Sequence, residues 1–149
     1  MKLEYTIYIE ATPEKVWEAL VSPEGTKAAF FGSELKSSFE VGAPFEYVGP
    51  GNDGDATVHV YGTVQAYEPG KKLGYLEHPG PSYREEHARL TSRVTFELEE
   101  AGTTTKLTLV NDEWSENHPA VDNARGAWPM VVSSIKTWCE TGKTLDFGW

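Results

Sequence analysis

The segment AVDNARGAWPMVVSSIKTWCETGKTL, residues 120–145, decides the fold that we predict for this chain. At about 100° per residue, its apolar side chains share one face of a helix, within an arc of roughly 140°. They are Val121, Ala124, Ala127, Trp128, Val131, Val132, Ile135, Trp138 and Cys139. Gly142 stands where a left-handed C-cap belongs, and Pro129 should bend the helix. We therefore expect one long C-terminal helix whose apolar stripe is buried along its whole length.

The residues before this helix predict a strand, two short helices and an antiparallel sheet. Alternating apolar residues from Leu3 indicate the first strand, and Thr12-Pro13-Glu14 is typical of a helix start. This helix should end at Ser22-Pro23, and a second short helix should span Thr26 to Phe31. Six further strands are expected at residues 33–39, 44–48, 56–67, 72–78, 90–99 and 104–114. Gly62, inside the longest of them, suggests a bulge or a bend.

These elements predict an α+β fold in which a strongly bent antiparallel sheet is wrapped around one long helix. The 149 residues show no repeat, linker or low-complexity tract, so we expect a single domain over 1–149. A domain of this size buries roughly 70% of the surface that its unfolded chain exposes. Such an arrangement leaves a cavity between sheet and helix.

Composition excludes several classes of function. The formal net charge of -10 argues against nucleic acid and anionic membrane as partners. The single cysteine, Cys139, lies on the helix stripe, so no intrachain disulfide can form and a reducing compartment is favoured. No signal peptide or membrane-spanning run is evident, and we expect no membrane insertion and a cytoplasmic protein.

The run AWPMVVSSIKTWCETGK, residues 127–143, resembles the terminal helix of the START-like helix-grip (SRPBCC) superfamily. It is most similar to the branch named after the activator of the heat-shock-protein ATPase, whose helix commonly reads Gly-Trp-Pro and later Glu-Thr-Gly-Lys. The resemblance implies a helix-grip fold like that of the birch pollen allergen, with six to seven strands and two short helices after strand 1. Two departures are Ala127, where glycine is usual, and Phe30-Phe31, where the family often has tryptophan.

Motifs that carry chemistry are few. No Gly-x-Ser-x-Gly turn occurs, and the glycine-rich loop 49–55 lacks the lysine and the following helix of a phosphate-binding P-loop. The histidines are His59, His78, His87 and His118. None forms a pair with metal-ligand spacing, although His78 and His87 flank a loop with Glu85 and Glu86, where a fortuitous metal site is the alternative to ordinary loop residues. We expect no metal and no cofactor.

Glu77 and Asn111 are the candidates for acid–base chemistry in the cavity. Glu77 shares the parity of Tyr75, so an inward-facing strand would bury its carboxylate and raise its pKa; alternatively the strand end opens to solvent. Asn111 stands where relatives often carry histidine, and it either orients a ligand carbonyl or caps its strand. His59 and Tyr61 lie on the more polar face of their strand and are expected outside.

Aromatic residues are abundant, with five Trp, seven Tyr and six Phe. Aromatic walls with a few polar tips are typical of a small-molecule site, although the same residues could simply fill a core. The predicted cavity lining comprises Phe30, Phe31, Tyr47, Tyr75, Asn111, Trp114, Ala124, Trp128, Val131 and Ile135.

These features favour a protein that encloses a hydrophobic or aromatic small molecule. The first alternative is an enzyme of the cyclase, aromatase or hydrolase kind found on other branches of the superfamily, with Glu77 and Asn111 as its acid–base pair. The second is a co-chaperone-like interaction module, as the branch name suggests. We expect no chaperone partner, because that name describes a eukaryotic relative with an additional domain.

Overall fold

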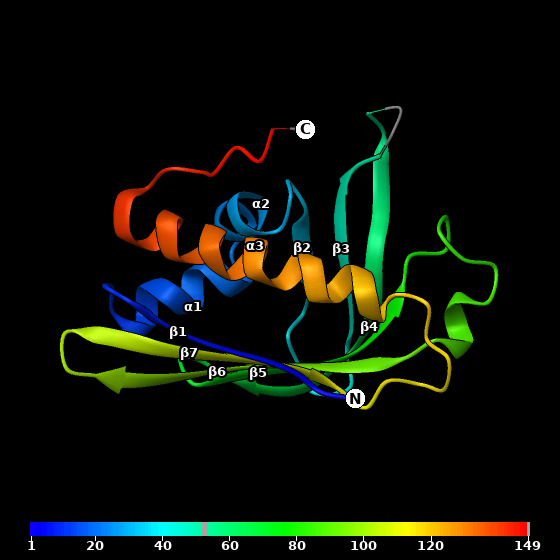
Figure 1. Cartoon of the computed structure of the whole chain (residues 1–149), viewed down its shortest axis with the longest axis horizontal. Helices are drawn as coiled ribbons and strands as arrows, with labels where there is room; N and C mark the ends of the chain where they lie inside the picture. The colour runs from blue at the N-terminus through cyan, green and yellow to red at the C-terminus, as the bar shows by residue number, and fades with distance from the viewer. Residues whose placement is uncertain (52–53, 149) are drawn as a thin grey trace.

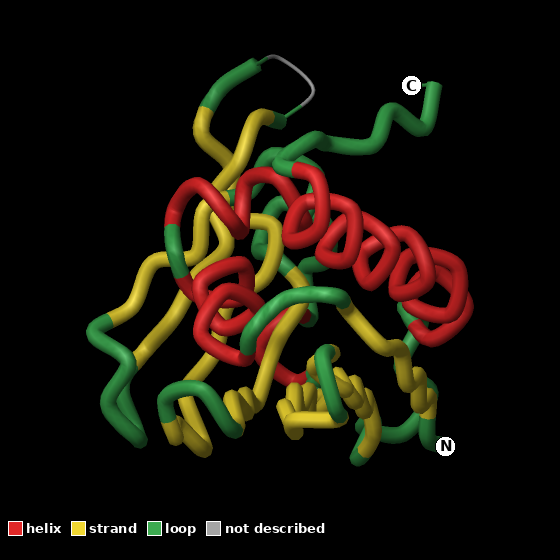
Figure 2. Tube along the Cα trace, turned by 90° about the vertical axis from the view of Figure 1, so that its left-hand side faces the viewer, coloured by secondary structure: helices red, strands yellow, loops and turns green. Residues whose placement is uncertain are grey.

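The computed structural model describes residues 1–51 and 54–148, and it places them in a seven-stranded antiparallel sheet with three α-helices and a 3-10 helix (Figure 1). In chain order the elements are β1 (Leu3–Ile9), α1 (Pro13–Val21), α2 (Pro23–Ala29), β2 (Glu34–Ser37), β3 (Pro44–Pro50), β4 (Ala56–Glu68), β5 (Lys72–Pro79), η1 (His87–Arg89), β6 (Ser92–Ala101), β7 (Thr104–Asp112) and α3 (Val121–Thr141). The strand order is β1-β7-β6-β5-β4-β3-β2. The helices lie inside the bend of the sheet (Figure 2), so the predicted helix-grip fold is confirmed. Asn52 and Asp53 of the predicted glycine-rich loop lie outside the described residues.

β4 contains two irregularities of strand pairing that accompany the bend of the sheet. Its pairing shifts by one residue against β3 between Tyr47 and Val48, and against β5 between Val64 and Ala66. Bulges of this kind bend a strand and increase its twist. In Figure 1, β3 and the first part of β4 stand upright from the layer formed by β1, β5, β6 and β7. Gly62, the site of the predicted bulge or bend, lies between the two shifts and is not itself a bulge.

The second bulge also reverses the faces of the last residues of β4. Simple alternation along the strand predicts that Tyr67 points outward. Instead its ring centroid lies 5.5 Å from that of Trp17 and 5.3 Å from that of Phe39, against the core. That prediction is wrong because one inserted residue moves every later side chain to the opposite face.

Proline-led caps position the two short helices. Thr12 caps α1 through its side chain, and Ser22 ends α1 and caps α2 in the same way, accepting a 3.0 Å hydrogen bond from the Gly25 amide. The second helix begins at Pro23 rather than at the predicted Thr26. The reason is that a hydroxyl cap followed by proline starts a helix at Ser22-Pro23, as it does at Thr12-Pro13.

α3 runs without interruption through Pro129 and ends at the predicted Gly142 cap, whose φ is 74°. Because proline has no amide hydrogen, the carbonyl oxygen of Arg125 lacks its usual helical donor. The Tyr5 hydroxyl donates a 3.3 Å hydrogen bond to this oxygen instead. β1 therefore supports the helix at the position that proline weakens.

Two polar contacts fasten the C-terminal half of α3 to β1. The Lys136 ammonium group donates to the carbonyl oxygen of Tyr8 at 2.7 Å, and the Glu10 amide donates to the carboxylate of Glu140 at 2.7 Å. These contacts also occupy backbone groups at the edge of the sheet.

The apolar stripe of α3 is buried only in its second half. The buried residues are Val131, Val132, Ser134, Ile135 and Cys139, whereas Val121, Ala124, Ala127 and Trp128 keep partial exposure. α3 packs mainly against α2, β1 and α1. The prediction of burial along the whole stripe is wrong, because the stripe residues of the first half, and Trp138 in the second half, remain partly exposed.

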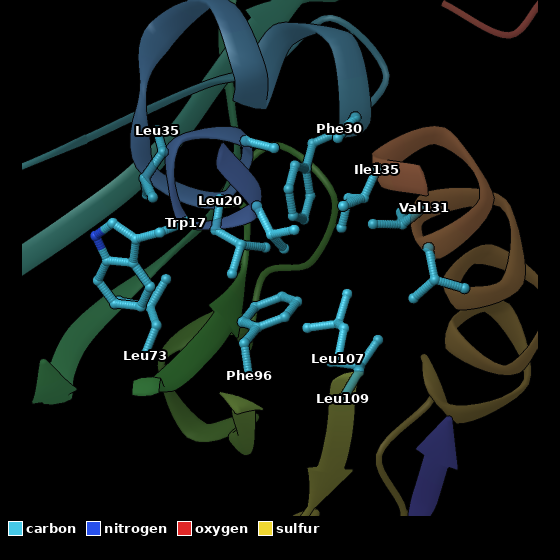
Figure 3. Packing of buried hydrophobic residues seen from close by; sticks show 14 of the residues in the cluster. Trp17, Leu20, Phe30, Leu35, Leu73, Phe96, Leu107, Leu109, Val131 and Ile135 are labelled. Carbon is cyan, nitrogen blue, oxygen red and sulfur yellow. The ribbon is translucent and has the colours of Figure 1, made fainter. Parts of the chain in front are cut away.

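The core lies between the concave face of the sheet and the three helices (Figure 3). α1 contributes Trp17 and Leu20, and Phe30 follows the end of α2. The sheet contributes Leu73, Phe96, Leu107 and Leu109, and α3 contributes Val131 and Ile135. Within the described residues, no helix has the length and apolar character that a membrane crossing requires.

Two glycine substitutions test the packing of the helices. A Cβ atom at Gly25 would lie 2.5 Å from the Cα of Ala19, so Gly25→Ala should lower the free energy of unfolding by about 1–3 kcal/mol. Gly126 lies inside α3 with open space around it, so Gly126→Ala should raise the free energy of unfolding by about 0.5–1 kcal/mol. Urea denaturation of both variants measures the difference, and equal effects would contradict the described packing of α1 against α2.

Candidate functional site

Two rows of cross-strand neighbours on the concave face of the sheet form the candidate site. In the first row Phe45 lies opposite Gly62, Gly62 opposite Glu77, and Glu77 opposite Ser92. In the second row Val64, Tyr75, Val94 and Asn111 are successive partners across β4 to β7. Directly opposed side chains in such rows have Cβ atoms about 4.5–5.5 Å apart. Glu77 and Tyr75 therefore lie in a polar patch within an otherwise apolar surface.

Glu77 is a recessed carboxyl group without a partner. Among residues 1–51 and 54–148 it forms no hydrogen bond and no ion pair. Burial raises the pKa of Glu77 to about 7, although part of the side chain stays accessible to solvent. The alternative in which this strand end opens fully to solvent does not match this environment. A carboxyl group with such a pKa changes its charge near neutral pH.

Tyr75 adds a second unpaired group beside Glu77. Its side chain is 1% exposed, and its hydroxyl forms no hydrogen bond of ordinary geometry within the described part of the chain, although the Tyr47 hydroxyl lies close enough to interact with it. Burial raises the pKa of Tyr75 well above its ordinary value, with further contributions from Tyr47 and Glu77. Burial also raises the pKa of Tyr47. Both phenols are therefore neutral at physiological pH.

Asn111 links the sheet to α3, and its side-chain amide forms hydrogen bonds through both its nitrogen and its oxygen. Its Nδ2 group donates to Ser92 Oγ at 3.1 Å and to the carbonyl oxygen of Arg93 at 2.9 Å. Its Oδ1 atom accepts a 3.0 Å hydrogen bond from the indole of Trp128. These contacts leave the amide no free hydrogen, so Asn111 positions Trp128 and Ser92.

Ser92 is the site residue that the sequence reasoning missed. It is 1% exposed and faces Glu77 across the β5–β6 pair. The signal was available, because Ser92 has the same parity as Val94 and Phe96, which are expected to face inward. A small polar residue at the end of an apolar alternation indicates a buried hydroxyl that needs a partner.

Aromatic rings surround the polar patch. The rings of Phe45 and Tyr75 stack with centroids 4.2 Å apart, and Tyr47 stands nearly perpendicular to both, at 83° and 87°. Phe30 lies 5.0 Å from Tyr47, and Trp128 makes an edge contact of 6.1 Å with Phe96.

The predicted cavity residues fall into three groups. Phe30, Tyr47, Tyr75, Asn111, Val131 and Ile135 are buried on the inner side of the sheet and helices. Trp114, Ala124 and Trp128 are partly exposed near the first half of α3, and the Trp114 indole donates to the Asn111 carbonyl oxygen at 3.2 Å. Phe31 is 46% exposed and lies 6.4 Å from Phe147 of the C-terminal segment, so its assignment to the cavity lining is wrong. The physical reason is that Phe31 follows the end of α2 with a φ of 53°, which turns its side chain away from the core.

His59 and His78 lie on the outer face of the sheet, His87 reaches that face from η1, and His118 packs against Trp114 in the loop before α3. Tyr61 stacks on its cross-strand partner His78, and its hydroxyl is hydrogen-bonded to His87 Nδ1. His59 is paired with Tyr83 in the same way. These contacts hold the segment 80–91 against the sheet. Over the described ranges, no group of three or more His, Cys, Asp or Glu side chains could hold a metal ion.

Two surface hollows lie away from the polar patch. One is bounded by α2, α3 and the C-terminal segment, and the other lies over the outer face of β5, β6 and β7. Neither includes Glu77 or Tyr75.

Comparison with known proteins identifies the family. The profile of the family described as "Activator of Hsp90 ATPase homolog 1-like protein" matches residues 10–140. The chain belongs to this family. A search of curated proteins finds no match.

Solved structures similar to this member of the Activator of Hsp90 ATPase homolog 1-like family support the fold. Protein MLL2253 from Mesorhizobium loti shares 24% sequence identity with a TM-score of 0.72, over 92% of this chain and 95% of that one. The Aha1 dimer from Colwellia psychrerythraea shares 20% identity with a TM-score of 0.72, over 96% and 98%. CalU16 from Micromonospora echinospora shares 18% identity with a TM-score of 0.70, over 95% and 77%. At these identities the likeness establishes the helix-grip fold.

The Glu77 environment predicts a specific dependence of stability on pH. The folded protein holds the Glu77 proton up to a pKa of about 7, whereas the unfolded chain releases it near the ordinary 4.5. The free energy of unfolding should therefore fall as pH rises between these values, by on the order of 2 kcal/mol after allowing for the remaining solvent contact, and then level off. Urea denaturation across this range should show the decrease in the native protein and its absence in Glu77→Gln.

The exposed Glu99 provides the matched control. Glu99→Gln should retain the pH dependence of the native protein. If Glu77→Gln retained it as well, the carboxyl group of Glu77 would not be desolvated in the folded state.

Proposed function

We propose that this protein binds a small organic molecule between the concave face of the sheet and the first half of α3. The polar end of the ligand would lie at Glu77 and Tyr75, and its apolar or aromatic body against the surrounding rings. The observation that carries the proposal is the buried Tyr75 hydroxyl, which lies beside the Glu77 carboxyl group; neither has a hydrogen-bond partner of ordinary geometry among the described residues.

Unpaired buried polar groups are uncommon because each one costs about 1–3 kcal/mol relative to a satisfied group. A phenylalanine at position 75 would fill nearly the same volume without this cost. Glu77 carries a further cost, since burial opposes its ionisation. A ligand that supplies partners to both groups would offset these costs and would gain affinity from doing so.

The surroundings suit a ligand with an apolar body. Phe45, Tyr47 and Phe30 offer ring faces and edges beside the polar patch. The first half of α3 keeps partial exposure, and Trp128 contacts the sheet through its indole. Movement of this half of the helix would admit a ligand without disturbing the contacts of Lys136 and Glu140 with β1.

An enzyme using the same site is the second candidate, and the pKa of Glu77 favours it. A carboxyl group with a pKa of about 7 can both accept and donate a proton near neutral pH, as a general acid or base must. A cyclase, aromatase or hydrolase would return a chemically altered ligand, which mass spectrometry detects. Glu77→Gln should then retain binding and lose conversion. We propose no chaperone partner, because the groups without partners lie in the interior.

The binding proposal predicts a localised response in the indole signals of the five tryptophans. Aromatic metabolites captured from a cell extract should shift the indole N–H resonance of Trp128, which is assigned through Trp128→Phe. The resonance of Trp138, near the other end of α3, should stay in place. Nuclear magnetic resonance measures both, and native mass spectrometry identifies the retained molecule. The absence of any retained ligand and of any Trp128 shift would contradict the proposal.

Tyr75→Phe should separate stability from binding. Removing the unpaired hydroxyl should raise the free energy of unfolding by about 1 kcal/mol and weaken the binding of a captured ligand. Tyr8→Phe is the control, since Tyr8 is 52% exposed, and it should change neither quantity. Denaturant titration and calorimetry give the two values. A less stable Tyr75→Phe variant with unchanged affinity would mean that the hydroxyl has only a structural role.

A further inference from the structure

The strongest unexplained feature of the site is that, within residues 1–51 and 54–148, no cationic side chain pairs with its acceptor groups. The cross-strand partners of Glu77 are Gly62 and Ser92, neither of which carries a charge. Arg93 follows Ser92 but has the opposite parity, and it pairs with Asp112 at 2.8 Å and Glu113 at 3.5 Å. Glu77 interacts electrostatically with two titratable groups, the phenols of Tyr47 and Tyr75.

The rings near Glu77 have an arrangement that suits a positive charge. Phe45 and Tyr75 are stacked, and Tyr47 is nearly perpendicular to both, with centroid distances of 6.0 Å and 6.3 Å. The face of an aromatic ring is negative, so a cation within about 6 Å of a ring centroid is attracted to it. Ring edges are positive, so only a ring face turned toward the Glu77 carboxylate attracts the cation.

The hydrogen-bonding groups of the site also favour a positively charged ligand. An ionised Glu77 carboxylate only accepts hydrogen bonds, and the Tyr75 hydroxyl has free acceptor capacity. An ammonium group offers three donors and a positive charge. An anionic ligand would meet a carboxylate without a compensating cation, and the net charge of -10 would oppose its approach.

We infer that the ligand of this site carries a cationic amine, held by the Glu77 carboxylate and the Tyr75 hydroxyl against the rings of Phe45 and Tyr47. This inference rests on the proposed binding function and names the chemical class of its ligand. Pairing with a cation stabilises the ionised carboxylate in the interior, so the amine supplies the positive charge that no described side chain provides beside Glu77. The aromatic or apolar part of the ligand extends toward Phe30 and Trp128.

Three probes of matched shape test the inference: 2-phenylethylamine, 2-phenylethanol and phenylacetate. They share a ring and differ in the charge of the head group. Calorimetry at about pH 8, above the Glu77 pKa of about 7, should show the amine binding at least tenfold more tightly than the alcohol, with phenylacetate weakest. Each probe that binds should shift the Trp128 indole resonance.

Substitution of the carboxylate gives the decisive comparison. Glu77→Gln keeps the shape of the side chain and removes its charge, and it should reduce amine affinity at least tenfold while leaving alcohol affinity unchanged. Glu99→Gln should change neither affinity, since Glu99 is exposed. A denaturation curve for each variant confirms that it folds.

The other outcomes are distinguishable. If the alcohol or phenylacetate binds as tightly as the amine and shifts the Trp128 resonance, the cation inference is overturned and the proposed binding function stands. Equal amine affinity in the native protein and Glu77→Gln also overturns the inference. If no probe binds at about 10 mM, the inference is overturned. The proposed function is then overturned as well if native mass spectra show no retained molecule.

Discussion

The hydrogen bond from the Trp128 indole to the Asn111 side chain sets the relation between helix and sheet on which the candidate site depends. A tryptophan side chain is long, and here its polar tip is fixed to a strand while its ring makes an edge contact with Phe96. Together with the 3.3 Å hydrogen bond from the Tyr5 hydroxyl to the Arg125 carbonyl oxygen, the indole hydrogen bond ties the partly exposed first half of α3 to the sheet. The second half behaves differently, because Val131 and Ile135 are buried against the core. The two halves of α3 thus differ in how deeply their apolar side chains are buried.

Polar groups lie beside the hydrogen bond between Asn111 and Trp128. A packed core of this size normally satisfies its buried hydroxyl and carboxyl groups, because leaving them unpaired lowers stability. Asn111 and Ser92 follow this rule through their mutual hydrogen bond. Tyr75 and Glu77 do not, although each lies one strand away from that bonded pair. Functional sites commonly retain such local costs, which the remainder of the core offsets.

Much of the fold could be predicted from the sequence because its signals are local and periodic. The Gly142 cap, the proline-led start of α1 and the antiparallel strands all follow from residues near one another. The failures have non-local causes. Tyr67 faces the core because a bulge shifts the β4–β5 pairing, and nothing in the strand itself encodes that shift. Phe31 points outward because of the conformation after α2. For Glu77, the alternation along its strand predicted that the side chain faces inward. Its lack of a hydrogen-bond or ion-pair partner became visible only once β4 and β6 were placed on either side of β5.

The most direct test of this account is the titration of the Glu77 carboxyl carbon by nuclear magnetic resonance in the ligand-free protein, with Glu77→Gln used to assign the signal. A recessed carboxyl group without a cation predicts a midpoint of about 7. Addition of an amine that occupies the site should lower this midpoint, since a paired cation favours the ionised form. A midpoint near the ordinary value of 4.5 in the free protein would show that Glu77 is hydrated or paired, and it would contradict the central claim.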